Sequence, residues 1–463
     1  MSISQEKVED AETGSERTAV PGGVAKLFRM LMQSALVRQV SGSFALKVFF
    51  TLLTFVTGIV LAQTMGAEGY GYYTYALSWV SLLSFPAMLG LEKLLIREVA
   101  RKKAMESWSE LRGLIKWTDC MVLFSSLAAA GAAAGAVWFA RGALDAVAVQ
   151  SLLVAMIIIP FLAFLRIRQG AVCGLGHVVI AQVAQFAVRP VLFLILIAAL
   201  ALSTGLSAPV AVLARAVSVA LALGISLVLL KRYMPGPARD VRPTPYSSIW
   251  LKSGLTFLAA GTASIVNERL SVILVGSLLG PEETAFFEAA NRGALLITFG
   301  PEAVYLSIGP TVARLFAAGE KSELQYLITR SVRWTILAAV PILLAFVLLG
   351  RWYLFLFGEE FIAAKPVLTI LCFSYLAHVA FGPTSLLLNM TGHERLTAVG
   401  VALAAVINAG LTLSLIPVLG VTGAALGQLG SVVFYKMLLA AVIHKRLGLV
   451  SFFGLPYRAW NRP

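Results

Sequence analysis

Charge, cysteine and histidine are scarce in this sequence. Only 13% of its 463 residues are charged, and it contains three cysteines and four histidines. Cys120, Cys173 and Cys372 lie far apart in apolar surroundings, so no disulfide framework is indicated. The histidines show no HExxH or comparable ligand spacing. We therefore expect no disulfide-stabilised domain, no metal site and no bound cofactor.

Motifs for nucleotide hydrolysis and acyl or glycosyl transfer are also missing. The sequence has no GxxxxGK[ST] loop, no DxD and no GxSxG. None of the loops expected outside the cytoplasm is long enough to hold a catalytic domain. These absences favour a protein that is not an enzyme.

Apolar residues, by contrast, are abundant. They make up 59% of the chain, and the mean hydropathy is +0.86, which is typical of a polytopic membrane protein. The first 25 residues are polar and acidic, without the basic start and short apolar core of a cleaved signal peptide. We expect this tail to stay in the cytoplasm and Lys26 to Arg38 to form a basic amphipathic helix on the membrane surface.

Long apolar segments recur along the rest of the chain, each close to the length of about 20 residues that a bilayer requires. They predict twelve transmembrane helices. These lie at about residues 43–65, 71–90, 117–139, 149–165, 180–202, 209–230, 254–278, 284–309, 332–350, 366–389, 397–417 and 421–443.

The basic residues between these spans are distributed unequally. The net charge is +14, but 26 Lys and Arg lie in segments on one side of the predicted membrane and only Arg141, Arg351 and Lys365 on the other. This bias places the basic side in the cytoplasm, and an even span number returns the C-terminus there. The same placement beside spans argues against a nucleic-acid partner.

An internal repeat divides the chain. MGAEGYGYYTYA at 65–76 is followed 214 residues later by LGPEETAFFEAA at 279–290, and both place a Gly-small-Glu turn before paired aromatics. With six spans in each half, the repeats are parallel. We therefore predict an all-α polytopic membrane protein with two pseudo-symmetric six-helix lobes around a central cleft. The predicted domains are a cytoplasmic tail with the surface helix (1–42), the two lobes (43–230 and 254–443), a cytoplasmic linker (231–253) and a second cytoplasmic tail (444–463).

Polar residues interrupt the apolar stretch from Ser253 to Gly280. Asn267, Glu268 and Arg269 lie near its middle, where a charge costs about 2.5 to 3.5 kcal/mol on insertion scales. These side chains should face other helices or a water-filled cavity rather than lipid. Two interpretations stay open: a Glu/Arg pair that joins two helices, or a cavity lining.

Other predicted spans carry polar stripes as well. Six cations and three glutamates lie within spans, so the predicted interior is net cationic. Such a lumen suits an anionic phosphate or pyrophosphate headgroup, because Arg offers a planar fork of donors. For Lys436 and Arg215 we favour a buried pair or a side chain that snorkels from a span end. The predicted substrate-binding residues are Lys47, Thr51, Gln185, Arg189, Asn267, Arg269, Asn291 and Arg292.

Several segments resemble one transporter family. GSFALKVFFTLLTFVTGIVLAQTMGAEGYGYYTYALS at 42–78 and LGLEKLLIREVAR at 89–101 resemble the start of the Wzx-like flippases, the polysaccharide-transport branch of the multidrug/oligosaccharidyl-lipid/polysaccharide exporter superfamily. The resemblance covers most of residues 40–445. Its second-lobe patterns are NERLSVILVGSLLG at 267–280, FGEEFIAAKPVLTIL at 357–371 and INAGLTLSLIPVLGVTGAALG at 407–427.

The resemblance implies a function and partners. It implies alternating access between two lobes, and transport of undecaprenyl-pyrophosphate-linked oligosaccharides across the bacterial inner membrane for surface polysaccharide biosynthesis. The implied partners are this substrate, membrane lipids, and polysaccharide polymerase and chain-length proteins. Lys47, Arg269, Arg292 and Asn408 occupy places where the family has similar residues, whereas Ser271 stands where relatives often carry Asp.

Two further interpretations stay open. A multidrug or cation antiporter of the same superfamily would use Glu268 and Glu288 for ion coupling. Such exporters favour an acidic cavity, however, and the first six spans have no central carboxylate. A non-transport scaffold of a polysaccharide assembly complex would not need charged stripes. Deleting the gene and identifying the lipid-linked intermediate that accumulates would distinguish these interpretations.

Overall fold

The computed structural model describes residues 35–203, 205–244 and 248–452 of the chain. These residues form helices joined by short turns, with no strand among them. The chain divides into two compact units, Met1–Gly42 and Ser43–Pro463, and the second contains both lobes. The predicted acidic tail and most of the predicted surface helix at 26–38 lie outside the described residues.

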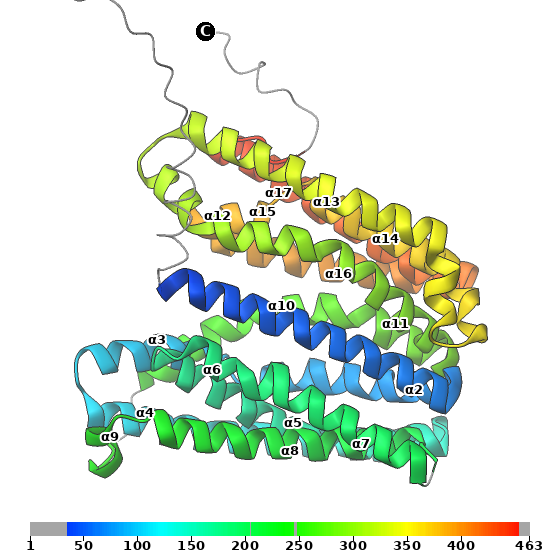
Figure 1. The fold of residues 1–463 in the computed structure, drawn as a ribbon, viewed down its shortest axis with the longest axis horizontal. Helices are drawn as coiled ribbons and strands as arrows, with labels where there is room; N and C mark the ends of the chain where they lie inside the picture. The colour runs from blue at the N-terminus through cyan, green and yellow to red at the C-terminus, as the bar shows by residue number, and fades with distance from the viewer. Residues whose placement is uncertain (1–34, 204, 245–247, 453–463) are drawn as a thin grey trace, which may run out of the picture. The chain divides into compact units, whose positions relative to one another are not determined.

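The first lobe begins with α2 (Ala35–Ala87), which contains two predicted spans. Its 53 residues would extend about 80 Å as one rod, far more than a bilayer needs. Gly66 interrupts it with φ 67° and ψ −179°. A Cβ placed on Gly58 would lie 3.3 Å from the hydroxyl of Tyr70. The chain therefore turns back at Gly66, and the second half of α2 returns toward α3 (Figure 1).

The other helices of this lobe follow the predicted spans closely. A surface connector, α3, precedes the third span, and a short α9 follows the sixth. The elements are α3 (Leu91–Ala104), α4 (Trp108–Phe139), η1 (Ala140–Ala143), α5 (Ala146–Gly174), α6 (Val178–Val183), η2 (Ala184–Val188), α7 (Arg189–Ser203), α8 (Ala208–Tyr233) and α9 (Gly236–Asp240).

The fifth predicted span is not a regular helix. It consists of α6, the π-helical turn η2 and α7. Pro190, the second residue of α7, has no backbone N–H to donate, and its ring crowds the carbonyl one turn earlier. A π-turn accommodates this conflict, and such turns are frequent at functional sites. Gln185 and Arg189 lie in and immediately after this turn.

The second lobe repeats the hairpin of the first. Gly280 joins α10 to α11 with φ 100° and ψ −175°, close to the conformation of Gly66. Both turns therefore need the left-handed region that glycine tolerates. The elements are α10 (Ser248–Leu278), α11 (Pro281–Leu295), η3 (Leu296–Thr298), α12 (Phe299–Ala317), α13 (Lys321–Phe355), η4 (Glu359–Ala364), α14 (Lys365–Ala380), α15 (Thr384–Met390), α16 (Glu394–Leu419) and α17 (Val421–Leu447).

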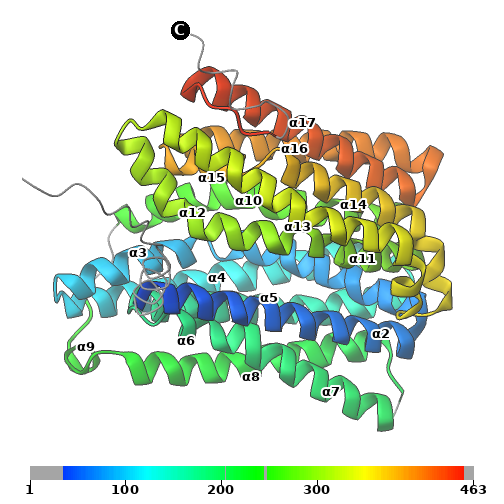
Figure 2. The same cartoon turned by 45° about the horizontal axis from the view of Figure 1, so that its top comes forward.

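Nine helices in the described part are long and apolar enough to cross a membrane, or ten if the bent pair Pro281–Tyr305 and Ser307–Ala317 is one span. Twelve were predicted. The difference arises because Ser41–Ala87 contains two predicted spans and because α10, 31 residues long, is not among those counted. Figure 2 shows α4 to α8 on one side and α12 to α17 on the other.

Candidate functional site

A cavity of about 440 Å³ lies between the two lobes. Helices α2, α5, α7 and α8 of the first lobe and α10, α11 and α14 of the second contribute to its wall, with η2 and η3. Eight of the ten residues singled out from the sequence line it. They are Thr51, Gln185, Arg189, Glu268, Arg269, Glu288, Asn291 and Arg292.

The remaining two lie outside this lining. Lys47 is exposed on α2, where its carbonyl accepts a hydrogen bond from the Thr51 hydroxyl at 3.0 Å. Asn267 is half-buried, and its Oδ1 is buried without a hydrogen-bond partner among the described residues. Thr51 lies one helical turn after Lys47 on the same face of α2, and the cavity lining includes Thr51 but not Lys47.

The charge of the lining is positive. Five arginines and two glutamates contribute to the wall, so the lining carries a formal charge of +3. The arginines are Arg166, Arg189, Arg215, Arg269 and Arg292, and the glutamates are Glu268 and Glu288.

The second-lobe arginines have carboxylate partners. Arg269 contacts the adjacent Glu268 at 2.9 Å. Arg292 donates from Nε to Glu288, four residues earlier, at 2.9 Å. Its Nη1 also donates to the carbonyl of Thr54 at 2.9 Å, so this guanidinium joins the second lobe to the first. A Cβ on Gly58 would lie only 2.8 Å from that Nη1, so a larger residue there would displace the end of the Arg292 side chain.

In the described part of the chain, two arginines of the first lobe, Arg189 and Arg215, contact aromatic rings instead of carboxylates. Arg189 is 7% exposed, and its guanidinium lies over the ring of Phe50 at 5.6 Å. The guanidinium of Arg215 lies over Phe193 at 4.7 Å. Among the described residues neither has an ion pair with a carboxylate. An unpaired charge away from water is costly, so these two groups require a wet cavity or an anionic ligand.

The π-turn η2 places the amide side chain of Gln185 in the cavity wall, close to Arg189 in the sequence. The Nε of Arg189 and the Oε1 of Gln185 are buried and have no hydrogen-bond partner among the described residues. The described residues thus leave a donor and an acceptor of two wall residues unsatisfied, and each of them needs a partner such as water or a ligand.

Arg166 has a weaker counter-charge. Its Nη1 lies 3.8 Å from Oε2 of Glu92 on α3. Burial raises the pKa of the Glu92 carboxyl, and the nearby Arg166 opposes that shift. Because the pKa is raised, this carboxylate is neutralised at a higher pH than an exposed glutamate would be, and Arg166 then adds its full charge to the wall.

The prediction for Arg215 was wrong. We expected a buried pair or a snorkelling side chain, and the structure places it in the cavity wall. Tyr375 was not singled out; it also lines the wall and donates to Oδ1 of Asn291 at 2.9 Å. A signal existed for Arg215 alone, because it lies several residues inside its predicted span and so has far to reach to water.

Lys436 and Asn408 belong to the interior of the second lobe instead. Lys436 is 2% exposed, and its Nζ donates to the carbonyl of Gly382 at 3.4 Å. It therefore does not snorkel. Asn408 donates to Oγ of Ser271 at 3.2 Å, so the polar pair is satisfied between α10 and α16.

The cavity is closed toward the Gly66 turn. Gln63 donates to the carbonyl of Leu356 at 2.9 Å, and Oε1 of Glu360 accepts from the backbone N–H of Ala67 at 2.6 Å. That N–H lies at the start of a helix, where it has no intrahelical partner. Aromatic rings fill the space behind these contacts, namely Tyr70, Phe357 and Phe361.

Two protein families match this sequence. The family described as Polysaccharide biosynthesis protein matches residues 36–313, and the MatE family matches residues 265–413. No curated protein gives a match.

Solved transporters have the same fold. An inward-facing multidrug resistance MATE transporter of the MOP superfamily superposes with a TM-score of 0.72 at 14% identity, covering 86% of this chain and 94% of that one. An outward-facing multidrug resistance MATE transporter of the MOP superfamily gives 0.62 at 14% identity, covering 90% of this chain and 97% of that one. A MOP superfamily transporter from Pyrococcus furiosus, for which reverse polarity of the binding pocket suggested a different function, gives 0.62 at 14%, covering 89% and 95%.

These matches confirm the predicted fold class, with its pseudo-symmetric lobes, and point to membrane transporters rather than enzymes. The first family covers more than half of the sequence, including the whole first lobe and the start of the second. The chain therefore belongs to the polysaccharide biosynthesis protein family, and it has the fold of the solved MOP superfamily transporters.

Proposed function

We propose that this transporter moves a lipid-linked oligosaccharide, carried on undecaprenyl pyrophosphate, from the cytoplasmic to the outer leaflet of the bacterial inner membrane. The product would be used in surface polysaccharide biosynthesis. The observation that carries the proposal is the pair of arginines, Arg189 and Arg215, that line a shared cavity without a carboxylate partner among the described residues. Their charge matches that of a pyrophosphate.

Charge compensation and the membrane potential both favour outward movement of a pyrophosphate headgroup through this cavity. A pyrophosphate crossing a low-dielectric bilayer needs compensating charge, and guanidinium groups provide it in bidentate geometry. An inside-negative potential also contributes about 2.3 kcal/mol per charge per 100 mV to outward movement of an anion. The lipid chain stays in the membrane while the headgroup and sugars cross the cavity.

The contacts of Arg292 in the second lobe can couple substrate binding to movement of the two lobes. A phosphate that binds Arg292 competes with Glu288 and with the carbonyl of Thr54, which belongs to the first lobe. Loss of the contact with Thr54 removes one hydrogen bond between the lobes. Substrate binding thereby favours their separation at this point.

The proposal is tested by complementing a flippase-deficient strain with Arg189→Gln and Arg215→Gln. A charge-assisted hydrogen bond contributes about 1.5 to 3 kcal/mol, so each variant should lower export roughly 10- to 150-fold. Arg141→Gln is the control, because Arg141 is exposed outside the cavity and stacks on Trp138 at 4.0 Å. Membrane levels of every variant are quantified, and we expect them to be normal because removing an unpaired buried cation costs no ion pair.

A binding measurement separates headgroup recognition from export. Farnesyl pyrophosphate should raise the Tm of the purified protein, and farnesol should not. Both arginine variants should lose this shift, whereas Arg141→Gln should keep it. Full export by both variants at normal abundance, or an equal shift with farnesol, would contradict the proposal.

A second candidate is a cation or drug antiporter. The side chain of Glu268 is 60% exposed and lines the cavity with Glu288, so two carboxylates are available for ion coupling. This alternative predicts ion-driven efflux of a cationic dye such as ethidium. Efflux lost with Glu268→Gln or Glu288→Gln but unchanged with Arg189→Gln would favour it over the flippase.

The orientation and partners form part of the same proposal. The excess of Lys and Arg on one side supports cytoplasmic termini, which puts the Gly66 turn on the outer side. Polysaccharide polymerase and chain-length proteins are the protein partners that the proposed export would involve.

A further inference from the structure

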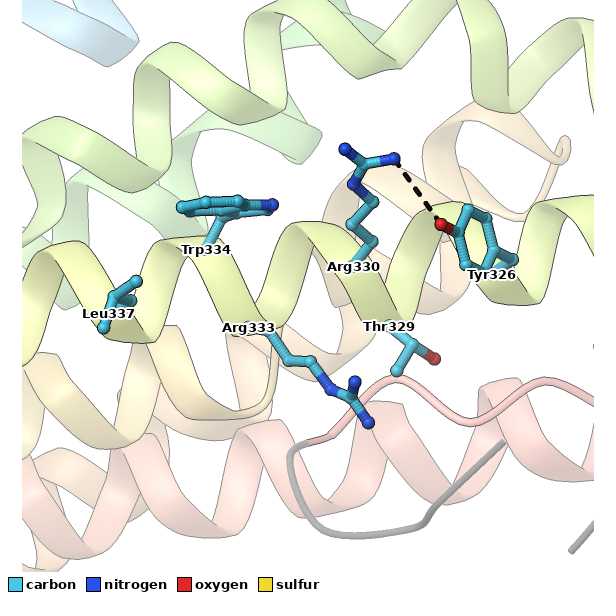
Figure 3. A pocket seen from close by; sticks show the side chains of 6 residues that line it. All are labelled: Tyr326, Thr329, Arg330, Arg333, Trp334 and Leu337. Carbon is cyan, nitrogen blue, oxygen red and sulfur yellow. Dashed lines mark hydrogen bonds between the residues drawn. The ribbon is translucent and has the colours of Figure 1, made fainter. Parts of the chain in front are cut away.

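A second hollow lies on α13, a helix that contributes no residue to the lining of the central cavity. Its volume is about 610 Å³, and it shares no lining residue with that cavity. At 100° per residue, its lining residues occupy an arc of about 140° on one face of α13. They are Tyr326, Thr329, Arg330, Arg333, Trp334 and Leu337 (Figure 3).

The chemistry of this face changes along the helix. Arg330 and Arg333 are exposed, and among the described residues neither forms an ion pair with a carboxylate. Trp334 and Leu337, which follow, are 57% and 63% exposed and begin the apolar part of the span. The two cations thus lie at the boundary between polar and apolar segments, where Trp side chains are enriched in membrane proteins.

The two guanidinium groups diverge around the hollow. Arg330 projects with Trp334 to one side and donates to the Tyr326 hydroxyl at 3.5 Å, while Arg333 projects to the other (Figure 3). A smaller hollow of about 440 Å³ shares Tyr326 with the first one. Its lining contains one further cation, the exposed Arg314 of α12, and one carboxylate, Glu323. The local charge therefore remains positive.

We propose that this face of α13 binds an anionic phospholipid, with the phosphate at Arg330, on the same side as Trp334, and an acyl chain against Trp334 and Leu337; Arg333 adds positive charge from the other side of the face. Charge complementarity selects an anionic headgroup. The adjoining exposed apolar side chains select a lipid over a soluble phosphate. The inference does not depend on the proposed transport function, because it concerns neither the central cavity nor its substrate.

The test measures binding of phosphatidylglycerol to the purified full-length protein by native mass spectrometry and by Tm. Phosphatidylcholine and soluble glycerol phosphate are the comparison ligands. Wild-type protein should prefer phosphatidylglycerol, and Arg330→Gln combined with Arg333→Gln should weaken its binding about 10- to 30-fold. Arg330→Lys with Arg333→Lys should retain the preference because the charges remain.

The matched control lies at the other end of the same helix. Arg351 is exposed and precedes Trp352, which is 71% exposed, but it lines neither of the two hollows at Tyr326. Arg351→Gln should leave the affinity unchanged. The proposal is overturned if Arg351→Gln weakens binding as much as the double variant, if the double variant keeps wild-type affinity, or if phosphatidylcholine or glycerol phosphate binds equally well.

Discussion

Gly71 provides the sharpest test of how the two lobes close over the cavity. It lies in the second half of α2, and a Cβ on it would be 1.8 Å from the backbone oxygen of Pro281, the first residue of α11. Real Cβ contacts stay beyond 3.0 Å, so Gly71→Ala must separate the two helices by more than 1 Å or bend one of them. A backbone oxygen cannot rotate away as a side chain does.

The magnitude follows from this conflict. Overpacking of this kind costs about 1 to 3 kcal/mol, and the cost applies only when the lobes are closed at the Gly66 end. The ratio of closed to open molecules should therefore fall about 5- to 150-fold. In a regular helix without such a neighbour, Gly→Ala instead stabilises by about 0.5 to 1 kcal/mol.

Accessibility of a cavity cysteine is the assay. Cys120, Cys173 and Cys372 are first replaced by serine or alanine, and Ser81→Cys places one thiol in the cavity wall. A membrane-impermeant maleimide added from the Gly66 side should label this thiol slowly in the parent and faster in the variant with Gly71→Ala. Unchanged labelling at normal protein abundance would refute the reasoning.

The control is a glycine with free space around it. Gly135 lies inside α4, and a Cβ there has no neighbour within 4 Å. Gly135→Ala should leave the labelling rate unchanged and maintain or raise the Tm. Equal acceleration by both substitutions would mean that lost backbone flexibility, rather than contact between the lobes, controls access.

Three further outcomes are expected. Reporter fusions after Arg101 should behave as cytoplasmic and those after Gly66 as external, and a consistent inversion would reverse the orientation. Glu360→Ala removes the carboxylate that accepts from the backbone N–H of Ala67. It should favour the open state by about 1 to 3 kcal/mol, measured as faster labelling of the same cavity thiol. Glu360→Gln keeps an acceptor and should increase the labelling rate less. Asp119→Ala leaves the nearly buried Arg168 without the carboxylate it contacts at 2.5 Å and should lower stability by about 2 to 4 kcal/mol, measured as Tm; an unchanged Tm would contradict that role.

Much of the architecture was predictable because it depends on local properties of the chain. Apolar length indicates a span, and a repeated Gly-small-Glu turn indicates two related halves. The matching conformations of Gly66 and Gly280 agree with that repeat. The cost of a charge within a bilayer likewise indicated that Arg189, Arg269 and Arg292 avoid lipid.

Only the tertiary structure decided which of these charges meet and which have partners. Arg215 and Lys436 had the same predicted environment, yet Arg215 lines the cavity and Lys436 is buried inside the second lobe. The rotation of each helix about its axis determines such outcomes, and that rotation depends on packing against segments hundreds of residues away. The bond from Arg292 to Thr54 spans 238 positions, and no local pattern encodes it. The sequence thus determined that the interior of this transporter is cationic, whereas packing between the lobes determined which arginines keep their charge available to a ligand.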